Sequence, residues 1–179
     1  MSIQELLRLL PAPEFPEEST SRSNWSVVEA DLQCRLPSDY KELVEIYGSG
    51  CFDGFLWVLN PFSGNPNIEL RSQVSTRLNA LRSLKMDFGE EIPFPLYPQV
   101  GGLIPWAFTD NGDVLYWITG ESVADWPVAV NAGRESDWRQ YELSSSGFLV
   151  ALFDRQLRVD IFPEDFPSRY PAFTPLSTH

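Results

Sequence analysis

The stretch LPSDYKELVEIYGSGCFDGFLWVL, residues 36–59, constrains the fold more than any other part of the chain. Apolar side chains recur at i, i+3, i+4 and i+7 from Tyr40, the spacing of one helix face, and Ser38 or Asp39 can cap that helix. Gly48 follows where a left-handed C-terminal residue is expected. The run FLWVL then predicts a strand with both faces covered. The stretch therefore predicts a helix that turns through a glycine corner into a strand.

The same kind of patterning predicts elements on both sides of the corner. Further helices are expected over residues 2–10, 24–33, 68–86 and from Ser144 onward, and further strands in LIPWAFT, DVLYWITG, WPVAVNA and WRQYEL. Asn111 and Gly112 separate the first two of these strands and predict a type I′ turn, in which both central residues have positive φ. No strand–helix–strand repeat is present. The order predicts an α+β fold with a mainly antiparallel sheet and helices packed against it.

The 179 residues are predicted to form a single domain, 1–179, with an N-terminal helix and loop over 1–23. The segment 160–179 reads as an extended, proline-rich C-terminal tail. Its prolines oppose regular structure, and its four spaced aromatic residues favour packing of the tail against the body. Trp57, Trp106 and Trp117 alternate within predicted strands and are expected in the core.

A formal net charge of -12 opposes direct nucleic-acid binding and attraction to an anionic membrane. A basic partner protein fits this charge, although acidity also serves solubility alone. The two cysteines, without a CxxC spacing, favour a reducing compartment, and we expect a cytoplasmic protein without a membrane span. The oligomeric state stays open.

Residues for catalysis are scarce in this sequence. The one histidine, His179, ends the chain, which opposes Ser/His/Asp, Cys/His and His-based zinc sites. No glycine-rich phosphate loop is present, so no metal or cofactor is expected. Acidic residues such as Asp110 and Asp113 flank the hairpin turn, where aspartate ordinarily forms turns, and a carboxylate-based enzyme is the weakest interpretation.

Residues of the corner and of the later segments also carry a family resemblance. The resemblance begins in the corner and extends through three later segments, IPWAFTDNGDVLYWITG, DWPVAV and SGFLVALF. It covers roughly residues 25–173. The chain resembles the SUKH superfamily, the Smi/Knr-like family, in an LP before a helix opened by DY, then YGxGxF and an apolar strand ending at proline. The matching residues of the corner are Leu36, Pro37, Tyr40, Leu43, Tyr47, Gly48, Gly50, Phe52 and Pro61.

The resemblance implies an α+β fold and, for bacterial members, a non-enzymatic immunity protein. Such a protein binds a cognate toxin domain, often a nuclease, of a polymorphic toxin system and neutralises it. The alternative that the resemblance leaves open is a regulatory protein-interaction module of the cell-wall-regulator type. The matched residues are structural, so the resemblance transfers no catalytic residue.

Acidic residues of the hairpin and of the loop after it are the candidate protein-binding surface. Trp126, beside that loop, is a candidate hot-spot residue, with core packing as its alternative. The helix over 68–86 carries four basic residues that form either a solvated face or a second recognition surface. The candidate protein-binding residues are Asp110, Asp113, Glu121, Asp125 and Trp126, and the basic residues of the helix are Arg71, Arg77, Arg82 and Lys85.

Overall fold

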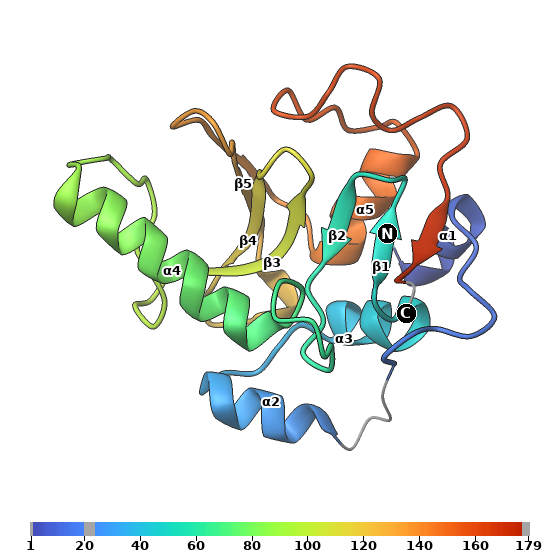
Figure 1. Cartoon of the computed structure of the whole chain (residues 1–179), viewed down its shortest axis with the longest axis horizontal. Coiled ribbons are helices and arrows are strands. Elements are labelled where there is room, and N and C mark those ends of the chain that lie inside the picture. The colour runs from blue at the N-terminus through green and yellow to red at the C-terminus, as the bar shows by residue number, and fades with distance from the viewer. Residues whose placement is uncertain (1, 20–23, 177–179) are drawn as a thin grey trace.

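The computed structural model describes residues 2–19 and 24–176, and Figure 1 shows their arrangement. The helices are α1 Ile3–Leu9, α2 Trp25–Leu32, α3 Ser38–Tyr47, α4 Leu70–Asp87 and α5 Ser145–Phe153, with a short 3-10 helix, η2, at Val123–Asp125. The strands are β1 Gly50–Phe52, β2 Leu56–Val58, β3 Leu103–Thr109, β4 Val114–Ile118, β5 Val128–Asn131, β6 Trp138–Tyr141 and β7 Phe173–Pro175.

These strands form one antiparallel sheet in the order β6-β5-β4-β3-β2-β1-β7. Strands β1 to β6 follow chain order and each pairs with the next, although α4 lies between β2 and β3 in the chain. Among the strands of the described residues, only β7, from the C-terminal segment, joins the sheet out of order, beside β1. The predicted α+β class with a mainly antiparallel sheet is confirmed.

Helices cover the two faces of the sheet unequally. On one face the Trp117 Nε1–H of β4 donates to Ser145 Oγ of α5 at 2.8 Å, and its ring centroid lies 4.8 Å from that of Tyr40 in α3. On the opposite face α4 packs on β3 and extends outward past the β5 side of the sheet (Figure 1). Strands β1 and β2 lie in front of α5, and α4 does not extend across them (Figure 1).

The glycine corner contains a strand, β1, that the sequence did not predict. Gly48 has φ 67° and ψ -150°, so the expected positive φ is confirmed but the expected left-handed helical conformation is wrong. A Cβ on Gly48 would lie 2.1 Å from the carbonyl oxygen of Glu17, so the N-terminal loop also requires glycine here. At Gly50 φ is not positive, and its need is for space, because a Cβ there would lie 2.3 Å from the ring of Phe173.

The β3–β4 turn differs from the predicted type I′ turn. Gly112 N–H donates to the Thr109 carbonyl at 2.9 Å, and Thr109 N–H donates to the Asp113 carbonyl at 3.0 Å, which leaves a three-residue loop. Gly112 has φ 88°, whereas Asn111 does not have a positive φ. The Asp113 carboxylate also accepts from the Thr109 hydroxyl at 2.7 Å. This side-chain bond holds Asp113 opposite Thr109, so the turn takes the three-residue form that ends in glycine.

The C-terminal segment lies along the sheet and α5. In β7, Phe173 pairs with Phe52 of β1, and its ring centroid lies 4.8 Å from that of Phe52 and 5.0 Å from that of Tyr47. Phe166 lies 4.6 Å from Phe55, also between centroids. Tyr170, by contrast, is 79% exposed. Prolines are tolerated here because β7 is an edge strand.

Candidate functional site

The described residues offer little for metal or thiol chemistry. Within 2–19 and 24–176 no group of three or more His, Cys, Asp or Glu side chains is placed to hold a metal ion. Cys51 is buried, and burial raises the pKa of its thiol to about 12, so it stays protonated. Burial likewise raises the pKa of Cys34. His179 lies outside the described residues.

None of the helices in those same ranges has the length and apolar character that a membrane-spanning helix requires.

The two aspartates predicted at the hairpin have different environments. Asp110 is exposed, and its Oδ1 accepts from the Trp57 Nε1–H at 2.8 Å. Asp113 is 4% exposed, and its Oδ1 accepts from Gly133 N–H at 2.9 Å. Asp113 therefore ties the β3–β4 turn to the β5–β6 turn, while Asp110 is free to meet a partner through its second oxygen.

The other candidate residues lie in the loop after β4. Glu121 and Asp125 are exposed, Asp125 in η2. Trp126 is 4% exposed, its Nε1–H donates to the Gly120 carbonyl at 3.1 Å, and its ring centroid lies 6.1 Å from that of Trp117. The structure thus places Trp126 in the core of the free chain, with its polar atom satisfied.

The five candidate residues do not form one cluster. The hairpin turn precedes β4 and the loop with Glu121 and Asp125 follows it, so they lie at opposite ends of that strand. Strand β4 has five residues, which at about 3.3 Å each separates the two sets by roughly 16 Å. The predicted acidic surface is therefore two surfaces.

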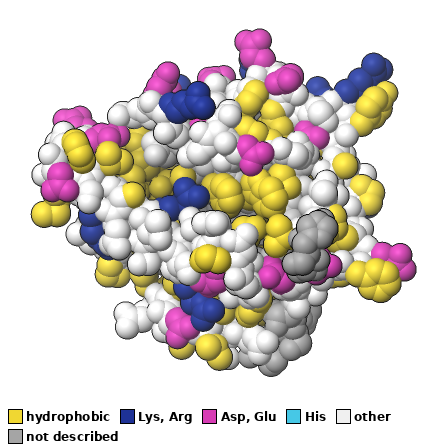
Figure 2. Space-filling view, in the orientation of Figure 1, with side chains coloured by type: hydrophobic (Ala, Val, Ile, Leu, Met, Phe, Trp, Pro, Cys, Tyr) yellow, Lys and Arg dark blue, Asp and Glu magenta, His cyan; other side chains and the backbone are white. Residues whose placement is uncertain are grey.

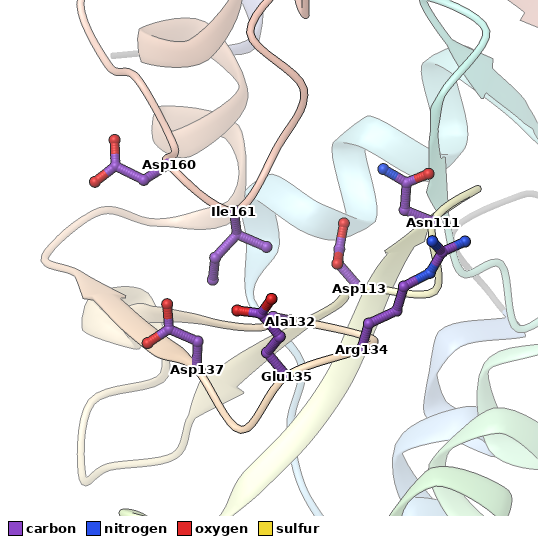
Figure 3. A pocket seen from close by; sticks show the side chains of 8 residues that line it. All are labelled: Asn111, Asp113, Ala132, Arg134, Glu135, Asp137, Asp160 and Ile161. Carbon is purple, nitrogen blue, oxygen red and sulfur yellow. The ribbon is translucent and has the colours of Figure 1, made fainter.

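Additional acidic residues surround the hairpin end of the sheet. A hollow of 290 Å³ is formed there by the β3–β4 turn, the β5–β6 turn and the start of the C-terminal segment. Figure 3 shows the carboxylates of Glu135, Asp137 and Asp160 around Ile161, with Arg134 extending toward the β3–β4 turn. Asp137 pairs with Arg139 at 2.6 Å, which leaves Glu135 and Asp160 as exposed carboxylates at the hollow. The β3–β4 turn, which also lines the hollow, carries the exposed Asp110. We call this region, residues 110, 135 and 160, the acidic end.

An aromatic pair lies on the sheet face that α4 covers only in part. Trp57 of β2 stands directly opposite Phe108 of β3, with ring centroids 6.3 Å apart and planes 9° from parallel. Both rings are half-buried, so the expectation that Trp57 is in the core is wrong, as is the expectation that both faces of β2 are covered. Trp106 and Trp117 are fully buried as predicted. Figure 2 shows hydrophobic side chains forming one broad area over β2 and β3 on this face.

The basic residues of α4 do not form one patch. Arg71 pairs with Glu69 at 2.9 Å and with Asp31 at 2.7 Å near the start of the helix. Arg82 and Lys85 are exposed. Arg77 instead turns to the sheet, where its Cζ lies 5.1 Å from the centroid of Phe108.

Sequence reasoning missed the aromatic pair and Arg77 as parts of a site. Arg77 follows Val74 by three residues and precedes Leu81 by four, so it falls within the apolar stripe of the helix. That spacing was the signal for an inward-facing arginine. For Trp57 no comparable signal exists, because an alternating strand does not reveal which of its faces a helix covers.

Comparison with known proteins gives a family and no individual relative. The SUKH_6 family model, described as SMI1-KNR4 cell-wall, matches residues 22–148, more than half of the 179-residue chain. No curated protein and no solved structure matches the chain. The matched range includes α2, the glycine corner, the aromatic pair, the β3–β4 hairpin and the start of α5. The chain therefore belongs to the SUKH superfamily, within the SMI1-KNR4 family.

Proposed function

We propose that this protein is a non-enzymatic immunity protein that binds and neutralises a basic toxin domain. The observation that carries the proposal is the half-buried Trp57–Phe108 pair on a sheet face that α4 covers only in part, with Asp110 bonded to the edge of Trp57. Exposed apolar area of this kind marks interaction sites, and tryptophan is over-represented among residues that dominate binding energy.

Charge supports a basic partner. The chain carries a net charge of -12, and the acidic end lies at the end of β3 that bears Asp110, next to the aromatic pair. Complementary charge accelerates association, and an aromatic anchor slows dissociation. In this proposal the aromatic pair lowers the dissociation rate of the complex, and the acidic end raises its association rate.

A truncation of the aromatic pair tests the anchor. We expect Trp57→Ala to raise the dissociation rate from the toxin domain encoded beside the gene by about tenfold or more, with little change in association rate. Phe88→Ala is the matched control, because Phe88 is an aromatic residue that is 78% exposed and follows the last residue of α4, outside the strands of the sheet. If both variants dissociate at the wild-type rate, the aromatic pair is not the contact.

Paired charge reversals separate the two acidic surfaces. Asp110→Lys with Glu135→Lys alters the acidic end, and Glu121→Lys with Asp125→Lys alters the loop after β4. Each double variant changes the net charge by the same amount, so their difference reports position rather than total charge. We expect the first pair to slow association more, and to lose this difference at high salt. Equal slowing by both pairs would assign the effect to net charge alone.

The regulatory-module alternative predicts a different partner. An immunity protein is encoded beside its toxin, whereas a regulatory module binds proteins of its own cell. Binding of the neighbouring gene product with protection of cells from it supports immunity, and failure of both favours the regulatory module.

A further inference from the structure

Arg77 has no acceptor for its guanidinium within the described chain. Its Nε is sealed from solvent and makes no hydrogen bond to any residue that the structure describes. Its two Nη atoms likewise have no hydrogen-bond partner among residues 2–19 and 24–176, yet they are not sealed. The one close contact is with the face of Phe108, 5.1 Å from Cζ to the ring centroid. Burial lowers the pKa of this side chain, which is the direction that an unpaired buried cation takes.

A partly buried charge without a protein partner loses part of its hydration, and native proteins usually pair such a group. Arg71, on the same helix, shows the usual arrangement: its guanidinium donates to Glu69, Asp31 and the Pro61 carbonyl. Stacking on one aromatic ring offsets only part of the cost at Arg77. The remaining donors point to a group that residues 2–19 and 24–176 do not supply.

Arg77 lines a cavity of 370 Å³ between α4 and the sheet. Buried Tyr116 of β4 contributes to it from the sheet, and Arg134 and Glu135 from the β5–β6 turn. Glu90, whose carboxylate accepts from the Ser136 hydroxyl at 2.7 Å, lies at the same cavity. This cavity adjoins the hollow of the acidic end, with which it shares residues 132, 134 and 135.

We propose that this cavity binds a single carboxylate group, held by the two Nη atoms of Arg77. A planar guanidinium matches a carboxylate with two parallel hydrogen bonds. Glu90 and Glu135 line the cavity too and repel a doubly charged phosphate more than a singly charged carboxylate. The Tyr116 hydroxyl, which can donate, stays protonated because burial raises its pKa.

The source of the carboxylate rests on the proposed function. The cavity lies beside the acidic end and the aromatic pair, so a protein bound there reaches it with an aspartate or glutamate side chain. Such a partner is basic overall and presents one acidic side chain to Arg77. That arrangement adds specificity, because a basic protein without the carboxylate leaves the guanidinium unpaired.

Titration of the free protein with acetate tests the site without any partner. A sealed Nε–H exchanges slowly with water, so Arg77 should give a resolved side-chain signal in a ¹⁵N-correlated NMR spectrum. We expect acetate to shift that signal with saturation, acetamide to leave it in place, and inorganic phosphate at equal ionic strength to shift it less. A shift that sodium chloride reproduces, or that persists in Arg77→Met, would overturn the proposal.

Substitution of Arg77 separates a binding role from a structural one. Arg77→Met keeps an apolar stem and removes the unpaired charge, so its melting temperature should equal or exceed that of the wild type. Arg82→Met, which removes an exposed charge of the same helix, is the control. A fall in melting temperature beyond that of the control would overturn the proposal, and Arg77→Lys would then show whether charge alone restores the fold.

Affinity for the neighbouring toxin domain identifies the source of the carboxylate. We expect Arg77→Met to weaken binding by about tenfold or more, and Arg82→Met to leave it unchanged. If acetate binds but Arg77→Met keeps full affinity, a partner side chain is excluded and a free carboxylate compound is the ligand. Failure of the toxin to bind the wild type overturns the proposed function, while the acetate result stands by itself.

Discussion

Gly48 illustrates how one backbone position fixes the path of the chain. Its N–H donates to the Val44 carbonyl at 2.9 Å and ends α3, and the next residue, Ser49, donates its N–H to the Glu17 carbonyl at 2.8 Å. The N-terminal loop therefore passes directly over Gly48, where a side chain would stand. Two separate demands, a glycine-only backbone conformation and an absence of Cβ, meet at this residue.

A second glycine provides a comparison for these demands. Gly54 has a similar φ, 62° against 67°, but no atom of the described residues lies within 4 Å of its Cβ position. Gly54→Ala should cost about 1 kcal/mol of stability through its positive φ, and Gly48→Ala clearly more, roughly 3 kcal/mol, because its ψ of -150° adds strain and the loop must also move. Thermal melting of both variants gives the comparison. Equal losses would mean that neither the ψ of Gly48 nor the loop above it adds a cost.

At the scale of elements, local signals predicted the helices well. The stripe of α4 and the cap of α5, where Ser144 Oγ accepts from Gly147 N–H at 3.3 Å, follow from residues three or four apart. The prediction that Asp39 can cap its own helix was wrong, because its hydrogen-bond partner is distant in the sequence. Its carboxylate accepts from Ser146 N–H at 2.8 Å, 107 residues away, and so caps α5. Strand β1 was missed because its pairing depends on β7 and β2, which no local pattern reveals.

The candidate site also has features that local sequence patterns predict and features that depend on distant parts of the chain. The exposure of Asp110 at a turn followed from the sequence, because turn chemistry is local. The separation of Glu121 from Asp110 did not, since it depends on the direction of β4 between them. The environment of Trp57 depends on where α4 ends its path across the sheet, which is a property of helix packing and not of the strand.

The edge strand β7 provides a further prediction at this scale. Phe173 packs its ring against Tyr47 and Phe52, and its backbone pairs with β1, so the tail adds the last strand at one edge of the sheet. Phe173→Ala should reduce the free energy of unfolding by roughly 2 kcal/mol, less than a fully buried phenylalanine, because its ring is only half-buried. Tyr170→Ala, which alters a side chain that is 79% exposed, should melt like the wild type. Matching melts for both variants would show that the tail adds no stability.

For the whole molecule, the uneven distribution of charge is the dominant property. The chain has 25 acidic and 13 basic residues, yet Arg77, beside Phe108, pairs with none of the acids that the structure describes, and Arg71 is neutralised by two acids at the start of α4. Much of the excess negative charge is therefore left on exposed loops, including Glu135 and Asp160 at the acidic end. Such charges repel one another in the free protein and attract a basic partner.

Salt should consequently act in opposite directions on folding and on binding. Between 0.05 and 0.5 M NaCl, screening of self-repulsion should raise the melting temperature of the free protein by roughly 2–4 °C, the shift that about 1 kcal/mol produces in a chain of this size. Over the same range the association rate with the toxin domain should fall.

The double variant Asp110→Lys with Glu135→Lys should weaken both salt effects, because it lowers the net negative charge by four units at the acidic end. Differential scanning fluorimetry and stopped-flow binding at matched salt concentrations measure the two effects. If neither the melting temperature nor the association rate changes with salt concentration, the acidic charge affects neither folding nor recognition. A single melting transition at every salt concentration would support one domain over residues 1–179.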